Sequence, residues 1–305
     1  MSARTGLGAL AVAVLAAVAE VGGRPGAGHR LTTHVLDVLE CEQGFGARYA
    51  YPLLQDLAAP WRLHLPLLDP SGNWGSQHGD PAADARYTEV RLSDVGALAL
   101  AAERGEVGPI PLGLVEGSLY RDGPVPPFGP DRVLEALTTG GADAGPPVLP
   151  TGGTVDGDIE ALLAGRRARL TLGCTVVAEP GRLVLTEVPL GVTTDLVAQH
   201  LANRVAAKRG PRYASYLDGL DSGDGIPGGA EVPILDVRDE SSLFGTRLVC
   251  GLRAGADPDD ARRWVRSVWP VTVEVDCRLP APMRRRLAAW DGGDGSGLAA
   301  LGALL

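Results

Sequence analysis

The chain has few cysteines, and their positions give no sign of a shared site. Cys41, Cys174, Cys250 and Cys277 are widely separated, with no C-x-x-C pair and no Cys/His cluster among the 305 residues. That spacing argues against a zinc motif and against a disulfide framework. The five histidines also lack ligand spacing on one helix face. We therefore expect a reduced, cytoplasmic protein without a metal site of its own.

An excess of positive charge is missing as well. The formal net charge is −9. Residues 1–145 carry 10 arginines against 17 acidic residues, and residues 146–305 carry 18 basic against 20 acidic residues, balances of −7 and −2. Because neutralisation of phosphates by Lys and Arg supplies most non-specific affinity for nucleic acid, this balance predicts weak DNA binding.

Length and composition indicate a globular protein with two domains. A chain of 305 residues can bury two moderate cores, and 45% hydrophobic with 21% charged residues is ordinary for such proteins, while 42 Gly and 24 Pro predict many turns. A Gly/Pro-rich run at 140–153 interrupts the apolar pattern. We accordingly predict domains at 1–145 and 146–290, with a tail at 291–305.

Periodicity predicts an α+β fold. Apolar residues recur at helical spacing from Leu31 to Leu39 and from Leu92 to Leu100. In the second half, β-rich runs at 167–178 and 182–188 precede a helical pattern at 193–208. That order of strand, strand and helix is typical of α+β proteins.

Two further elements are expected near the carboxy terminus. Asp257 is a plausible N-cap because Pro258 occupies the first helical position after it. Residues 271–277 alternate like a strand.

The first apolar stretch allows two interpretations. Leu7–Ala19 follows Arg4 and ends in Ala-Val-Ala, which imitates a secretory signal peptide. The alternative is a buried helix that remains in the protein. The resemblance described next favours the buried helix.

The segment from Gly72 to Glu89 carries the strongest chemical signal. It contains G-N-W-G-S at 72–76 and ends in A-x-A-R-Y-T-E, so an arginine, Arg86, directly precedes Tyr87. A phenol has an ordinary pKa of about 10, so a tyrosine nucleophile needs cationic or metal help. Arg86 is the adjacent candidate for that help.

This order of residues resembles the breakage-reunion (or A) subunit of DNA gyrase and topoisomerase IV, the type IIA DNA topoisomerases. In that family D-G-Q-G-N-F-G-S precedes A-A-x-R-Y-T-E. Glu187–Val192 resembles the family's E-I-P-Y-Q-V, and residues 237–247 resemble its L-R-D-E-S…G-x-R. The resemblance covers roughly residues 5–290.

The resemblance implies a fold and a mechanism. The first domain would be a winged-helix DNA-cleavage domain and the second an α/β tower-like domain. From the resemblance we also expect this chain to lack the family's coiled-coil gate and its C-terminal DNA-wrapping domain. Tyr87 would attack a DNA phosphodiester and Arg86 would stabilise the charged phosphate.

It also implies partners. We expect the chain to bind DNA and a gyrase B-type or gyrase A-type subunit, with a homodimer as a further option and no membrane. The catalytic Mg²⁺ and the ATP would come through a B-type partner, since the family's metal-binding acids are on that partner.

Departures from the family pattern weaken the expected basic cage around the DNA. Val12 and Ala13 stand where the family has paired arginines, and Gly8 stands where it has a lysine. Each missing cation removes a contact to the transition state. The loss costs about 3 kcal/mol if that contact is comparable to an oxyanion-hole donor. The remaining candidates for DNA contact are Arg30, Arg48, His64, Asn73, Ser76 and His78.

Two functions therefore stay open. One is tyrosine-mediated strand breakage and rejoining together with a B-type ATPase subunit. The other is a catalytically degenerate decoy or regulator that binds DNA or gyrase. Smaller candidates are an acidic loop with Asp218, Asp221 and Asp224, for which a solvated role is favoured over Ca²⁺ binding, and Leu119 or Tyr120 as a wedge between bases.

Overall fold

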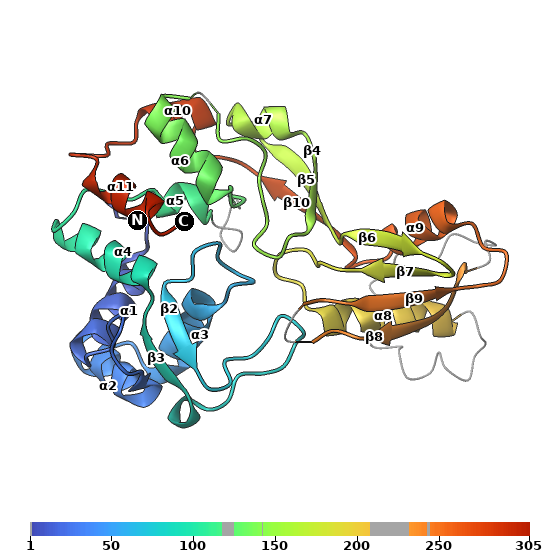
Figure 1. Cartoon of the computed structure of the whole chain (residues 1–305), viewed down its shortest axis with the longest axis horizontal. Helices are drawn as coiled ribbons and strands as arrows, with labels where there is room; N and C mark the ends of the chain where they lie inside the picture. The colour runs from blue at the N-terminus through green and yellow to red at the C-terminus, as the bar shows by residue number, and fades with distance from the viewer. Residues whose placement is uncertain (1, 118–124, 142, 208–231, 243–244) are drawn as a thin grey trace.

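The computed structural model describes residues 2–117, 125–141, 143–207, 232–242 and 245–305, and Figure 1 shows their arrangement. A mostly helical lobe contains both ends of the chain, and an elongated lobe is built on a sheet. The wedge candidates Leu119 and Tyr120 and the acidic loop at 218–224 lie outside the described residues. The α+β class predicted from periodicity is confirmed.

The first lobe is formed by chain segments from both ends of the sequence. Its helices are α1 (Ala9–Glu20), α2 (Thr32–Gln43), α3 (Ala47–Ala58), α4 (Asp94–Arg104), α5 (Leu112–Val115), α6 (Pro130–Thr139), α10 (Met283–Ala288) and α11 (Ser296–Gly302). A small antiparallel sheet in the order β1-β3-β2 lies among them, made of β1 (Arg30–Leu31), β2 (Leu68–Ser71) and β3 (Glu89–Leu92).

A second antiparallel sheet connects this lobe to the elongated one (Figure 1). Its order is β10-β5-β4, with β4 (Thr154–Gly157), β5 (Ala168–Gly173) and β10 (Thr272–Cys277), and α7 (Ile159–Leu163) packs against β5. Ala168, Leu170 and Leu172 alternate along β5 and bury their side chains with the core of the first lobe. The strand expected at 271–277 is confirmed.

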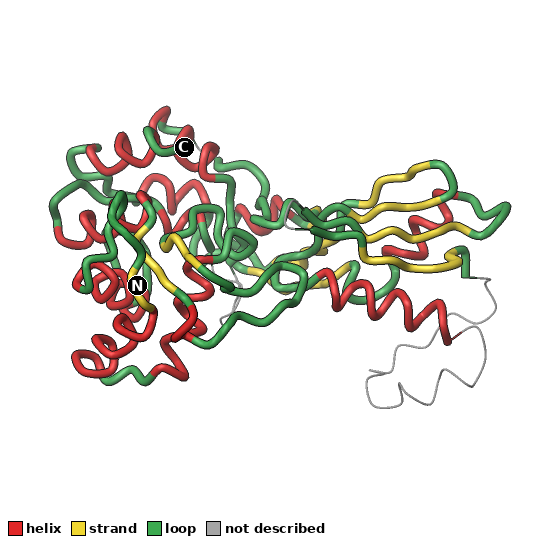
Figure 2. Tube along the Cα trace, turned by 60° about the horizontal axis from the view of Figure 1, so that its bottom comes forward, coloured by secondary structure: helices red, strands yellow, loops and turns green. Residues whose placement is uncertain are grey.

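The elongated lobe is a four-stranded antiparallel sheet with two helices. The order is β6-β7-β9-β8, with β6 (Val176–Glu179), β7 (Arg182–Leu185), β8 (Ile234–Asp239) and β9 (Leu248–Leu252). Helix α8 (Thr194–Ala207) packs along β8, and α9 (Pro258–Arg266) packs against β6 and β7. Figure 2 shows α8 running beside this sheet and away from the first lobe.

The apolar stretch at 7–19 forms a buried helix, as predicted. Val14, Leu15 and Val18 of α1 have no exposed surface, and α1 packs against α2, α3, α4 and β3. Burial of a Leu or Val side chain contributes about 1.5–3 kcal/mol. No helix within the described ranges combines the length and apolar character needed to cross a membrane.

Two apolar clusters form the cores, and their limits differ from the expected domain limits. One cluster extends from Val14 to Leu172 and then resumes at Cys277, whereas the other extends from Cys174 to Val271. Residues 291–305, expected as a tail, contain α11 and bury Leu301 in the first cluster. The first cluster continues across residue 145, so the two apolar cores do not separate there, and the domain boundary at 145 stays a prediction.

The start of α8 joins the two lobes. An α-helix leaves its first four backbone N–H groups without partners inside the helix. Here the backbone N–H of Thr194 donates to the carbonyl of Gln77 (3.2 Å) and that of Asp195 donates to the carbonyl of His78 (3.2 Å). The next two N–H groups donate to the hydroxyl and carbonyl oxygens of Thr193. The glycine-rich loop of the first lobe therefore caps a helix of the second.

Candidate DNA-cleavage site

Tyr87 is held at the surface by a fixed backbone. It ends the short 3₁₀ turn η1 (Ala85–Tyr87), and 67% of its surface is exposed. Asp84 caps that turn, since its carboxylate accepts from the backbone N–H of Arg86 (3.1 Å) and its carbonyl accepts from that of Tyr87 (2.9 Å). The phenol is thus presented to solvent from a defined turn, as a nucleophile for a large substrate requires.

A buried polar network directly after Tyr87 fixes this geometry. Thr88 is fully buried, and its hydroxyl donates to the hydroxyl of Thr32 (2.9 Å). Thr32 in turn donates its backbone N–H and its hydroxyl to the carbonyl of Thr88, both at 3.0 Å. The Tyr51 hydroxyl donates to the carbonyl of Ala83 (2.7 Å). Sequence reasoning missed Thr32 and Tyr51, because nothing in the chain order places them beside the R-Y-T-E motif.

Arg86 lies beside Tyr87 but is engaged by an acid. Its Nε and Nη2 donate to the two carboxylate oxygens of Asp84 at 3.2 Å, and its guanidinium carbon lies 5.3 Å from the centroid of the Tyr87 ring. These hydrogen bonds from Arg86 hold the pKa of Asp84 below its ordinary value. A guanidinium has five N–H donors. Three therefore remain for a phosphate, although the neighbouring carboxylate offsets part of the positive charge.

The glycine-rich loop uses its polar groups within the protein. The side-chain oxygen of Asn73 accepts from the backbone N–H of Gly75 (2.9 Å), and the hydroxyl of Ser76 donates to Asp80 (2.6 Å). The His78 ring bonds to the Thr194 hydroxyl and the Ser242 carbonyl, both at 2.9 Å. The three residues of this loop that were predicted to contact DNA thus form hydrogen bonds within the protein.

The other predicted DNA contacts are dispersed over the first lobe. Arg30, on the strand beside η1, donates its Nε to the carbonyl of Val21 (3.0 Å), and Arg48 is exposed in the first turn of α3. His64 is tied to the carbonyl of Val148 through Nε2 (2.9 Å), and burial lowers its pKa. A neutral, bonded imidazole is a poor phosphate ligand. Of the predicted contacts, Arg30 and Arg48 therefore retain exposed cationic groups, while Arg86 adds a partly compensated one.

No metal site is formed by the described ranges of the chain. No three side chains of His, Cys, Asp or Glu come together there in a way that could hold a metal ion. The four cysteines, all described, are free. Burial raises the pKa of the Cys174 and Cys250 thiols to about 12, which makes them poor nucleophiles. The supply of Mg²⁺ by a partner stays a prediction.

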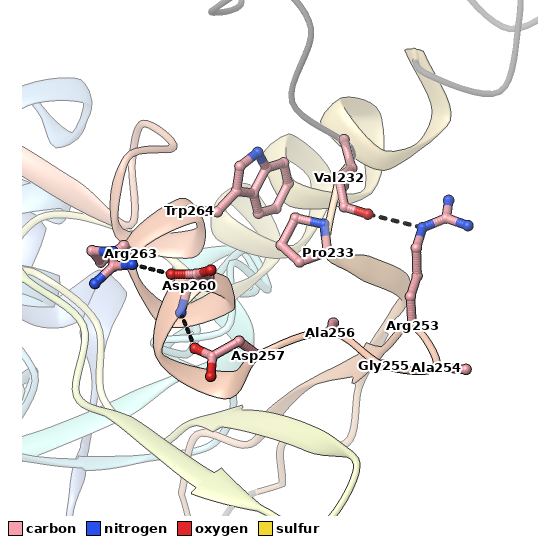
Figure 3. A pocket seen from close by; sticks show the side chains of 10 residues that line it. All are labelled: Val232, Pro233, Arg253, Ala254, Gly255, Ala256, Asp257, Asp260, Arg263 and Trp264. Atoms are coloured by element: carbon pink, nitrogen blue, oxygen red, sulfur yellow. Dashed lines mark hydrogen bonds and ion pairs between the residues drawn. The ribbon is translucent and has the colours of Figure 1, made fainter.

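A cavity of about 580 Å³ lies in the second lobe beside α9 (Figure 3). Arg263 is hydrogen-bonded to Asp260 and Arg253 to the carbonyl of Val232, so the charged groups of this cavity have partners. None of the predicted site residues lines it. The candidate site therefore remains the surface around Tyr87.

An exposed tyrosine on a rigid turn, next to an arginine and a small antiparallel sheet, defines a protein with a candidate tyrosine nucleophile. Comparison with known proteins shows what this chain is similar to. Residues 50–107 match the family of the DNA gyrase/topoisomerase IV A subunit. That segment contains the glycine-rich loop, Arg86 and Tyr87.

Individual relatives extend the similarity over most of the chain. The DNA gyrase A subunit of Aminobacterium colombiense is 28% identical over 300 residues, covering 84% of this chain and 34% of the relative. Its counterpart in Chlamydia trachomatis is 25% identical over 342 residues, covering 94% and 38%. The counterpart in Streptomyces coelicolor is 38% identical over 91 residues, covering 30% and 11%.

The resemblance to the DNA gyrase A subunit that the sequence motifs predicted is therefore confirmed, over most of this chain. It spans about a third of the length of the curated relatives it matches.

Proposed function

We propose that the chain binds DNA and uses Tyr87 to break and rejoin a strand in association with a B-type ATPase subunit. The observation that carries this proposal is the exposed phenol on a capped turn, inside the segment that matches the gyrase family. In this assignment the first lobe corresponds to a winged-helix part and the elongated lobe to a tower-like part.

The chemistry follows from the groups present. The Tyr87 oxygen attacks a DNA phosphorus, so a bond from oxygen to phosphorus forms while the bond from phosphorus to a sugar oxygen breaks. The departing sugar oxygen takes up a proton, and the phenolic proton is lost to solvent. Rejoining reverses both steps. Arg86 stabilises the negative charge on the phosphate with the donors that Asp84 leaves available.

The test is covalent capture of DNA. The full chain is incubated with a purified B-type subunit, Mg²⁺ and supercoiled plasmid, and then denatured. We expect a protein–DNA adduct with the natural chain and none with Tyr87→Phe. Tyr49→Phe is the matched control because Tyr49 is also highly exposed, at 71%, in the same lobe. An adduct that persists in Tyr87→Phe would overturn the assignment.

A second candidate function is binding without cleavage, as a decoy or regulator of a resident gyrase. It is favoured by the carboxylate paired to Arg86 and by the internal bonding of Asn73, Ser76 and His78. Co-elution of the chain with a B-type or A-type subunit, without any adduct under the cleavage conditions, would support this function. The same mixtures, prepared without the partner subunit, without ATP or without Mg²⁺, would show whether binding and adduct formation depend on each of them.

A further inference from the structure

The loop between β2 and η1 reaches from the first lobe to the start of α8 (Figures 1 and 2). At its tip the carbonyl oxygens of Gln77 and His78 accept from the first two N–H groups of α8. Gly79, directly after the tip, has a φ of +105°, a backbone conformation that favours glycine. The tip is therefore shaped to fit the helix end.

The His78 ring adds two side-chain bonds across the same junction. Nε2 faces the carbonyl of Ser242, which only accepts, so Nε2 carries a hydrogen. In the neutral ring Nδ1 then accepts from the hydroxyl of Thr194, a fully buried side chain. One imidazole thus bonds to α8 and to the segment after β8 at once.

The loop is also tied to itself from tip to base. At the tip, the backbone N–H of Ser76 donates to the carbonyl of Asp80 (3.2 Å), and the Ser76 hydroxyl accepts from the N–H of His78 (3.1 Å). At the base, the N–H of Ala83 donates to the carbonyl of Asn73 (3.0 Å). These bonds close the loop both at its tip and at its base.

The base adjoins the nucleophile. Ala83 is held by the Tyr51 hydroxyl, and the next residue, Asp84, caps the turn that presents Tyr87. We propose that His78 is a positioning residue that fixes the Tyr87 turn relative to the second lobe, with the loop as a strut rather than a phosphate cradle. Its effect on strand cleavage rests on the proposed function, but its effect on the position of the turn does not.

Hydrogen exchange measured by mass spectrometry tests the strut without any need for activity. In the full chain, His78→Ala removes the ring bonds, and His34→Ala is the control because His34 is an exposed histidine of α2. Two lost bonds predict exchange about tenfold faster in peptides covering 83–88 as well as in those covering 76–80 and 194–197. The control should leave all three unchanged.

Two further variants separate positioning from misfolding. Thr194→Val keeps the buried volume and removes one partner of the ring, so it should give a smaller increase at the same peptides. His78→Asn can restore a bond at the Nδ1 position and should recover part of the protection. Faster exchange at the tip and at α8, with 83–88 unchanged in every variant, would overturn the proposal.

The cleavage assay supplies the second readout. If the natural chain forms an adduct, His78→Ala should lower the rate of adduct formation at saturating DNA about tenfold while the Kd for DNA stays the same. An unchanged rate would contradict the positioning role. If the natural chain forms no adduct, the proposed function fails, and the exchange experiment still decides whether the strut exists.

Discussion

Glu116 provides a direct test of the electrostatics inside the first lobe. It directly follows α5 and is half-buried, and its carboxylate accepts from the backbone N–H groups of His64 and Leu65, each at 2.9 Å. Burial raises the pKa of Glu116 from its ordinary value of 4.5 to about 7, and the two N–H donors oppose this shift only in part. The ionised form is therefore disfavoured in the folded protein.

The sign and size of the effect on stability follow from linkage. The pKa of Glu116 is higher in the folded protein than in the unfolded chain. Its contribution to the free energy of unfolding is therefore complete below the unfolded pKa and is lost as the pH rises through the folded pKa. Each pKa unit corresponds to about 1.4 kcal/mol. Between pH 5 and pH 8.5 the contribution of Glu116 to the free energy of unfolding should fall by about 2.5 kcal/mol.

The assay is urea unfolding of the natural chain and of Glu116→Gln across this pH range, followed by circular dichroism. The glutamine does not titrate, so the difference in unfolding free energy between the two proteins should shift by about 2.5 kcal/mol in favour of the variant as the pH rises. Any loss of a hydrogen bond to Leu65 or His64 is a constant offset. Glu106→Gln, at an exposed position, should show no such shift. Parallel pH profiles for the natural chain and Glu116→Gln would refute the reasoning and would mean that the two N–H donors outweigh burial.

Two other predictions concern packing and charge. Phe128→Ala should lower the free energy of unfolding by about 3–5 kcal/mol because the side chain is fully buried, whereas Phe45→Ala, at an exposed position, should cost under about 0.5 kcal/mol, both measured by urea unfolding. The isolated chain should bind duplex DNA only at low salt, and the logarithm of its binding constant should fall only slowly with the logarithm of the salt concentration. Val12→Arg on α1 should steepen that slope by about 0.9, whereas Val177→Arg in the second lobe should leave it unchanged. An unchanged slope for Val12→Arg would contradict DNA docking at α1.

The local elements could be predicted because short-range patterns fix them. Leu7–Ala19 supplies enough apolar surface for a buried helix, and α1 occupies Ala9–Glu20. Asp257 caps α9 through bonds to the N–H groups of Asp259 and Asp260, as its position before Pro258 predicted. Helix α8 agrees with the pattern at 193–208 to within a residue at each end. Backbone hydrogen bonds and helix caps depend on neighbours in the chain, which the sequence displays.

Long-range partners were decided only by the tertiary structure. The residue types of Asn73, Ser76 and His78 suit a phosphate, yet the fold places the loop against α8 and directs His78 to Thr194 and Ser242. His64 likewise bonds to Val148, and the chain from Cys277 onward returns to the first core. A polar side chain bonds to whichever group the fold brings within about 3 Å. The motif therefore determined the resemblance and the nucleophile candidate, while three-dimensional packing determined which polar groups remain free of internal hydrogen bonds.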